Sequence, residues 1–318
     1  MDACAFASFL QHIPALTRPQ CAQVIALLAS AVNQACVADV IEAAATPGLC
    51  CPRCRSTQLY RHGTKSGLQR FRCRSCGRTF NSLTGTPLAR LRHKDKWRDY
   101  CQCMLDSRTV RKAADNVAVA KNTSLRWRHR LLTLTKTDRP ACLTGIAEAD
   151  ETFLLESCKG ARKLDRPARK RGGKASQPGI SKEHVCILVA RDRSGQTCDF
   201  VTGSGPVTTR QLKTHLVPIL ADDTLLVTDA NKAYRAFAEQ TGISHECVNL
   251  SAGERVRGAI HVQNVNGYHS RFHGWLRRFR GVATRYLPNY LGWQWAIDQE
   301  RINSPETLLR AAIGVFNT

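Results

Sequence analysis

The sequence lacks two features that direct proteins to membranes or out of the cell. No apolar run approaches the roughly 20 residues that a membrane-spanning helix requires. The opening residues, Met1 to Cys4, carry none of the positive charge with which a signal peptide begins. These two absences predict a cytoplasmic protein with no membrane partner.

Acidic residues are also few. The chain of 318 residues has 25 Asp and Glu against 47 Lys and Arg, a net charge of +22. Residues 46–136 hold 21 basic and 4 acidic residues, whereas residues 1–45 have a net charge of −2. Concentrated positive charge binds phosphates by releasing counterions, whatever the base sequence. The distribution therefore predicts a nucleic acid as the partner of residues 46–136.

Cysteine is abundant, but its odd count of 15 in a long chain speaks against a disulfide scaffold. Two pairs stand out, Cys51-Pro-Arg-Cys54 and Cys73-Arg-Ser-Cys76, with 18 residues between them. This spacing is typical of two thiolate turns that close on one tetrahedral zinc ion. We therefore predict a zinc ribbon over residues 46–90.

Within this ribbon we expect a strand over residues 58–61, a turn marked by Gly63 and Gly67, and a returning strand over residues 68–72. Arginine is frequent around both cysteine pairs, and Arg70 and Arg72 are candidates for contacts with DNA. A zinc site that only stabilises a small subdomain is the alternative. The preceding apolar residues 1–45 predict two short helices for packing or self-association.

Residues 91–137 have the pattern of a helix-turn-helix. Helices are predicted over residues 96–105 and 110–116, and a third begins at a cap formed by Asn122 or Thr123. A basic helix after a tight turn enters the major groove of DNA in such motifs. The candidate DNA contacts are the basic residues of this third helix: Lys121, Arg126, Arg128 and Arg130. A helical linker with a solvated basic face is the alternative.

Residues 138–295 predict an α/β domain with a mixed sheet, followed by a tail over residues 296–318. The expected strands cover residues 145–155, 185–190, 197–202, 224–230 and 245–248; the expected helices cover residues 208–220, 233–240 and 265–279. Between the first two strands, residues 158–183 hold nine Lys and Arg. They predict a basic loop, either mobile or simply solvated.

Two acidic residues lie in apolar strand surroundings. Asp150 is in the middle of the first strand and Asp229 ends the fourth. A buried carboxylate is costly unless it is paired or holds a metal. Taken singly, Asp150 could form a salt bridge at a strand edge and Asp229 could cap a helix. Taken together they suit phosphoryl chemistry, in which carboxylates hold two Mg²⁺ ions about 4 Å apart.

The chain resembles bacterial insertion-sequence transposases of the DDE superfamily that carry a zinc ribbon. The matching segments are the two cysteine pairs, Glu148-Ala-Asp150-Glu-Thr152, Thr228-Asp229 with Ala233-Tyr234, and His261-Val-Gln-Asn-Val-Asn-Gly-Tyr-His269. This resemblance covers about residues 50–295. It implies a ribonuclease-H-like catalytic fold that uses Mg²⁺ or Mn²⁺, with Asp150 and Asp229 as the first two ligands.

The third ligand departs from the family pattern, because Asn266 stands where Glu is usual, as in one subgroup of these enzymes. His273 replaces a basic residue of the family, and it or Arg277 is expected to reach a DNA phosphate. Three alternatives concern neighbouring residues: Asn266 as a helix cap with Glu254 as the third ligand, Glu148 or Glu151 as a catalytic carboxylate, and a zinc site at His269 and His273.

The resemblance implies a transposase of the bacterial cytoplasm, associated with the nucleoid. It would bind the terminal inverted repeats of an insertion sequence as a homo-oligomer on double-stranded DNA. Cleavage and strand transfer would then follow at one metal site. A catalytically inactive DNA-binding regulator and a ribonuclease-H-fold nuclease are the two alternative functions.

Overall fold

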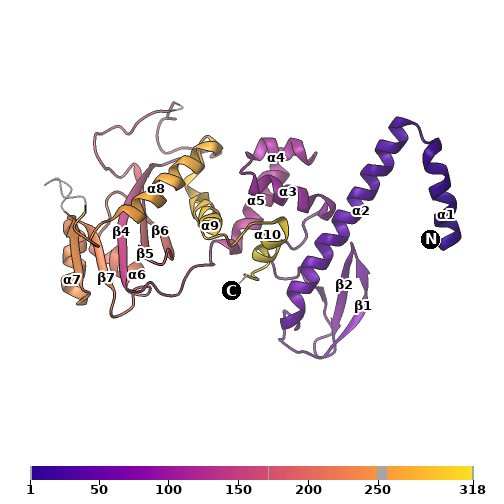
Figure 1. Ribbon diagram of the computed structural model, residues 1–318, viewed down its shortest axis with the longest axis horizontal. Helices are drawn as coiled ribbons and strands as arrows, with labels where there is room; N and C mark the ends of the chain where they lie inside the picture. The colour runs from indigo at the N-terminus through magenta and orange to yellow at the C-terminus, as the bar shows by residue number, and fades with distance from the viewer. Residues whose placement is uncertain (1, 171, 249–255, 317–318) are drawn as a thin grey trace. The chain divides into compact units, whose positions relative to one another are not determined.

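The computed structural model describes residues 2–170, 172–248 and 256–316 (Figure 1). The chain forms two compact units, each with its own packing. Unit 1 comprises Met1–Leu131 with Asn303–Thr318, and unit 2 comprises Leu132–Ile302. We describe each unit by itself.

Unit 1 begins with two apolar helices, α1 (Ala3–His12) and α2 (Arg18–Ala45), joined by a 3-10 turn (Ile13–Ala15). The expectation of two short helices is wrong for the second, which has 28 residues. Pro19 stands in the first turn of α2, where a missing backbone N–H does no harm, so it starts the helix rather than breaking it. Buried side chains in α2 come only from its last third: Val37, Ala38 and Ile41.

The helical segment Arg18–Gly48 contains an 18-residue window with a mean hydropathy of 1.9, and by length and composition it could cross a membrane. The expectation that no apolar run reaches this length is therefore wrong. Length and composition alone support the assignment, and core helices of water-soluble proteins pass the same criterion.

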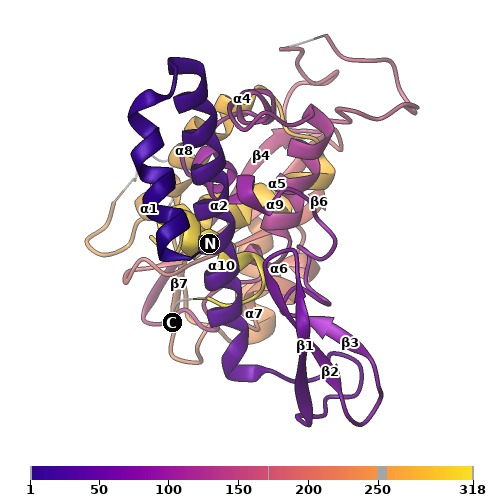
Figure 2. The ribbon, with the colours of Figure 1, turned by 90° about the vertical axis from the view of Figure 1, so that its right-hand side faces the viewer.

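The ribbon is a three-stranded antiparallel sheet of β1 (Leu59–Lys65), β2 (Leu68–Cys73) and β3 (Thr79–Asn81), seen at the lower right of Figure 2. Gly63 does not mark the turn, because it lies inside β1 with φ 70°, where the register shifts between Arg61 and Thr64. The turn is formed by Ser66 and Gly67. The third strand was not expected from the sequence.

The helices after the ribbon are α3 (Trp97–Leu105), α4 (Val110–Asn116) and α5 (Lys121–Thr135), close to the expected ranges. The last of them begins at Lys121, ahead of the caps expected at Asn122 or Thr123. The region expected to be a C-terminal tail instead contains α10 (Pro305–Ala312), which packs on α2 and α3. Arg98 of α3 pairs with Glu306 of α10 at 3.0 Å.

Unit 2 is built on a five-stranded sheet in the order β6-β5-β4-β7-β8. The strands β4, β5 and β6 are antiparallel neighbours, and β7 and β8 continue from β4 in parallel. The strand ranges are β4 (Ile146–Leu155), β5 (His184–Asp192), β6 (Thr197–Ser204), β7 (Leu225–Asp229) and β8 (His245–Val248). This mixed sheet with flanking helices is a ribonuclease-H-like fold, so the fold class is confirmed.

Helices cover the sheet of unit 2. The helix α6 (Thr209–Leu216) packs with α7 (Lys232–Thr241), and both contribute side chains to the core over the Ala147 and Ala149 face of β4. The helix α8 (Gln263–Leu276) contacts β4 and β5, and α9 (Leu287–Asp298) contacts β6 and α8. Side chains alternate between the two faces along a strand. Glu148, Asp150 and Thr152 therefore share the face of β4 opposite Ala147 and Ala149.

The basic loop between β4 and β5 is anchored by ion pairs near its ends. Arg166 pairs with Glu156 at 3.4 Å, and Arg169 pairs with Glu183 at 2.5 Å. These contacts place part of the positive charge of the loop against carboxylates rather than in solvent.

Candidate functional site

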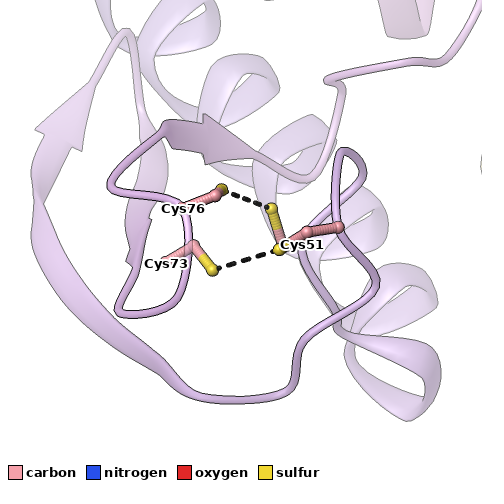
Figure 3. Close-up of side chains that lie close together, drawn as sticks. Cys51, Cys73 and Cys76 are labelled. Atoms are coloured by element: carbon pink, nitrogen blue, oxygen red, sulfur yellow. Dashed lines mark hydrogen bonds between the residues drawn. The ribbon is translucent and has the colours of Figure 1, made fainter.

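The four cysteines of the ribbon converge on one point. Their Sγ atoms all lie within 4.8 Å of one another, and the Cys51–Cys76 and Cys54–Cys73 distances are both 3.5 Å (Figure 3). A tetrahedron of sulfurs around zinc, with Zn–S near 2.3 Å, has S–S edges of about 3.8 Å. All four are free thiols. The geometry therefore fits the predicted structural zinc.

Backbone N–H groups favour the thiolate form at this centre. The pKa of Cys51 is lowered by the N–H groups of Cys54 and Arg53, and the pKa of Cys73 is lowered to about 6 chiefly by the N–H of Cys76. These donors belong to the turns that follow Cys51 and Cys73. Zinc binds the thiolate, so these turns prepare Cys51 and Cys73 as ligands, whereas burial and the neighbouring thiols raise the pKa of Cys54 to about 12 in the absence of the ion.

In unit 2, two carboxylates stand side by side. Ala149 of β4 and Thr228 of β7 are paired in parallel register, so Asp150 and Asp229 are the next residues along adjacent strands. Burial and the charge of Asp229 together raise the pKa of Asp150 to about 6. A divalent cation bound between the two carboxylates would neutralise their charge.

The structural alternatives for these two residues do not hold. The N-cap of α7 is Asn231, whose side chain accepts from the N–H of Ala233, so Asp229 is not the helix cap. Within the described part of the chain, the sole basic group within 4.0 Å of Asp150 is His269, at 3.9 Å. Burial lowers the pKa of His269 to about 4, with a further contribution from His273. His269 is therefore neutral near pH 7 and forms no salt bridge with Asp150.

Glu148 holds the start of α8 against β4. It is fully buried, and its carboxylate accepts from the N–H groups of Asn264 and Val265 at 2.8 and 3.0 Å. Arg193 and His261 contact the same carboxylate. A carboxylate at a helix N-terminus satisfies free N–H groups and the helix dipole. This role was missed from the sequence, although Glu148 shares a strand face with Asp150.

The helix α8 then runs along β4 in step with it. Asn264 and Val265 meet Glu148, His269 meets Asp150, and His273 Nε2 lies 2.6 Å from Thr152 Oγ1. Four helical residues rise about 6 Å and two strand residues about 6.6 Å, so the two periods match. Each turn of α8 is thereby placed opposite a defined position of the carboxylate strand.

Asn266 lies in the first turn of α8, three residues before His269, and its side chain is exposed. The N-cap is Val262, so Asn266 is not an ordinary cap. Glu254, the rival third ligand, lies outside the described residues. Glu151 points into the opposite face, where burial raises its pKa to about 7. Asn266 therefore stays the predicted third ligand, with Glu254 as the alternative.

The two basic candidates near the end of α8, His273 within it and Arg277 directly after it, differ in charge and exposure. His273 is half-buried and bonded to Thr152, and burial with the charge of Arg277 lowers its pKa, so it brings no positive charge near pH 7. Arg277 is exposed. In the described ranges, no cluster of three metal-binding side chains includes His269 or His273. The structure thus gives no support to a zinc site there.

One predicted DNA contact is wrong. Arg128 is fully buried in α5, and its guanidinium donates to the backbone oxygen of Arg108 at 2.6 Å. It holds unit 1 together and cannot face a phosphate. The other basic residues of α5 that were singled out are exposed: Lys121, Arg126 and Arg130. Arg70 and Arg72 of β2 stay predictions, since Arg70 is half-buried and Arg72, which donates to the Gly77 oxygen, is exposed.

Two family models match this chain. Residues 142–294 match the ISXO2-like transposase domain, and residues 44–77 match the InsA N-terminal domain, a zinc ribbon. A protein in transposable element ISH50 of Halobacterium salinarum is 30% identical over 251 residues, which cover 77% of this chain and 83% of the relative. The insertion element iso-IS1N protein InsA of Shigella dysenteriae is 58% identical over 41 residues, covering 13% and 44%.

Comparison with solved structures matches chains of an intasome and of a transpososome. A chain of the simian T-cell lymphotropic virus intasome is 11% identical, with coverage of 64% and 70% and a TM-score of 0.30. A chain of the pre-cleavage Mos1 transpososome is 13% identical, with coverage of 67% and 73% and a TM-score of 0.26.

Proposed function

The chain belongs to the ISXO2-like transposase family, and from this premise we propose that it cuts DNA at the ends of an insertion sequence and joins the freed ends to target DNA. The observation that carries this proposal is the pair of carboxylates Asp150 and Asp229 on adjacent parallel strands. Among the described residues, no Lys or Arg side chain lies within 4.0 Å of either carboxylate. Such a pair needs a divalent ion, which in phosphoryl transfer activates the attacking oxygen and stabilises the leaving one.

The residues of unit 2 have distinct tasks in this proposal. Asp150 and Asp229 hold the catalytic ions, and Asn266 adds a neutral oxygen from α8. Glu148 fixes the start of α8, so that His269 lies at the level of Asp150 and Asn266 lies one turn of the helix before it. Cleavage and strand transfer are both in-line displacements at phosphorus, and one site can serve both.

Unit 1 supplies DNA binding in the same proposal. The ribbon and α5 present exposed basic residues, and the helices α4 and α5 are arranged in sequence as in a helix-turn-helix. Of the basic residues first singled out, we retain Arg70, Arg72, Lys121, Arg126 and Arg130 in unit 1 and Arg277 in unit 2. Arg128 is excluded by its burial.

Two ends must be held together, so we propose that the protein acts as a homo-oligomer. The surface offered for this is apolar: α1 has no buried residue, and Ile25, Leu28 and Val32 of α2 are 55–66% exposed. Between Ala3 and Ala38 the only charged side chain is Arg18. Two copies that each carry a net charge of +22 repel each other over their basic surfaces, so contact between copies is least unfavourable at this nearly uncharged surface.

Sedimentation of Ile25→Asp/Leu28→Asp as a monomer would support this surface. An unchanged oligomer in this variant would contradict the proposed interface. Binding of the wild type to lipid vesicles that the variant loses would also contradict it, because that result would assign α2 to a membrane.

The experiment that tests the function uses DNA carrying the repeats that flank the gene. We expect Mg²⁺-dependent nicks at the 3′ ends of the element, followed by joining of those ends to a target duplex. End binding without any nick would favour the inactive regulator. Nicks that are never joined to target DNA would favour a nuclease of the same fold.

A further inference from the structure

A basic cleft lies within unit 1, between the ribbon sheet and the segment that follows it. Its volume is about 680 Å³, and residues 65–94 supply its lining. Four cations line it, Lys65, Arg70, Arg90 and Lys94, and no carboxylate does. Its size is that of a ligand site, but its walls are far more basic than those of sites for neutral molecules.

None of the four cations has an ion-pair partner in the described ranges of the chain. Partial burial lowers the pKa of Lys94, which shows that its charge is held away from solvent without a compensating anion. Unpaired cations gathered in one concavity raise the local positive potential, and they repel one another until an anion enters.

The backbone around the cleft is strained. Ser66 and Arg90 line it with φ of 52° and 61°, and His93, beside Lys94, has φ of 58°. Residues other than glycine rarely adopt the left-handed region, and they persist there where the surroundings impose it. Two of the turns that carry the cleft's charges contain such residues, Ser66 beside Lys65 and His93 beside Lys94.

We propose that this cleft binds the sugar-phosphate backbone of DNA. It rests on the proposed function, because it assigns a place for DNA on unit 1, and it adds Lys65, Arg90 and Lys94 to the contacts. The lining offers cations, hydroxyls and the amide of Asn81, whose Oδ1 already accepts from the N–H of Leu83 and the hydroxyl of Thr84. The cleft therefore positions the duplex without selecting its sequence.

The test compares two double variants of equal charge in the full-length protein. Lys65→Gln/Arg90→Gln removes two cations of the cleft, and Arg18→Gln/Arg310→Gln removes two exposed cations of unit 1 outside it. Binding is measured by fluorescence anisotropy against salt, on an element-end duplex and on a random duplex. Lys65→Arg/Arg90→Lys keeps the charge, and zinc content and circular dichroism report on folding.

For the cleft variant we expect the slope of log K against log salt to fall by about 2, and affinity to fall about tenfold, equally on both duplexes. The control variant and the charge-conserving variant should bind as the wild type does. Equal losses of DNA affinity in the cleft and control variants would overturn the proposal that the cleft binds DNA. Displacement of DNA by tripolyphosphate at equal phosphate concentration would overturn it as well, because the cleft would then bind small polyphosphates as readily as DNA. Absence of any preference of the wild type for element ends would instead overturn the proposed function, and the slope on random duplex would still decide the cleft.

Discussion

Arginine does different work in the two units of this protein. In unit 2, arginines form ion pairs, among them Arg139 with Asp199, Arg193 with Glu148, and both Arg191 and Arg271 with Asp298. In unit 1, the described ion pairs are two, Arg98–Glu306 and Arg108–Asp106, while the ribbon arginines have none. The paired arginines join strands, helices and loops of unit 2 to one another, and the unpaired ones of unit 1 remain available to phosphate. Net charge alone would not show this division.

The largest expected effect comes from the four-cysteine zinc site, which holds together the ribbon that carries unpaired arginines. Cys76→Ser should release the zinc and weaken end binding by more than about a hundredfold, because a structural zinc supplies most of the folding free energy of a small ribbon. Unit 2 should stay folded. Cys50→Ser, one residue before the cluster, is the matched control. Zinc content measured by native mass spectrometry decides the matter, and retention of zinc by Cys76→Ser would show that the ribbon assignment is wrong.

The next effect concerns Asn266. Its amide oxygen lacks the charge that makes carboxylates strong ligands for Mg²⁺, so we expect a requirement for about millimolar Mg²⁺ that Mn²⁺ relieves. Asn266→Ala should lose cleavage by about a hundredfold or more, and Asn266→Glu should shift the metal titration to lower concentration. Glu254→Gln is the comparison variant. Full cleavage by Asn266→Ala with none by Glu254→Gln would move the third ligand to Glu254.

A smaller effect tests a paired arginine. Glu148→Gln leaves Arg193 without its buried partner, and breaking such a pair costs about 4 kcal/mol in the free energy of unfolding. The control is Glu151→Gln on the opposite face of β4, where the carboxyl already has a pKa of about 7 and an amide mimics its protonated form. Urea unfolding and hydrogen exchange of α8 should separate the two variants. Equal stability would mean that Glu148 does not clamp α8.

The smallest effect is a pH dependence. The pKa values of Asp150 and Glu151 are raised from 3.8 and 4.5 to about 6 and about 7, so the folded state binds their protons more tightly than the unfolded state. Their contribution to stability is complete below about pH 4 and is lost as the pH rises toward about 7. Without Mg²⁺, we expect the free energy of unfolding to fall by about 2 kcal/mol between about pH 6 and about pH 7.5. Asp150→Asn should flatten this slope, and an equally steep slope in that variant would contradict the assignment.

Much of the fold followed from periodicity, and the failures have identifiable causes. The strands β4 to β8 lie within two residues of their expected ends because apolar runs bounded by turns mark buried strands. The helix α9 was missed because its own side chains are buried all around its axis, among them Tyr290, Trp293 and Trp295. The helix therefore has no polar face that would reveal its period. In α2, Pro19 stands in the first turn and starts the helix, so the apolar N-terminal segment forms one long helix instead of the second of two short ones.

The site shows the same limit at the level of side chains. The carboxylates Asp150 and Asp229 were identified from their strand positions. The burial of Arg128 was not, although Arg126 and Arg130 lie four apart and Arg128, two from each, must face the other way. The role of Glu148 depends on where α8 begins in space, which no local pattern states.

We propose that the two units divide the work: unit 1 binds DNA and unit 2 carries out the chemistry. One gel with an end-labelled duplex tests it directly, because it shows bound and cleaved DNA together for the wild type, Asp150→Asn and Asp229→Asn. We expect both variants to bind the element end as tightly as the wild type and to cut it at no measurable rate in Mg²⁺. Cleavage by both variants would place the active site elsewhere, and loss of binding in both would contradict the division between the two units.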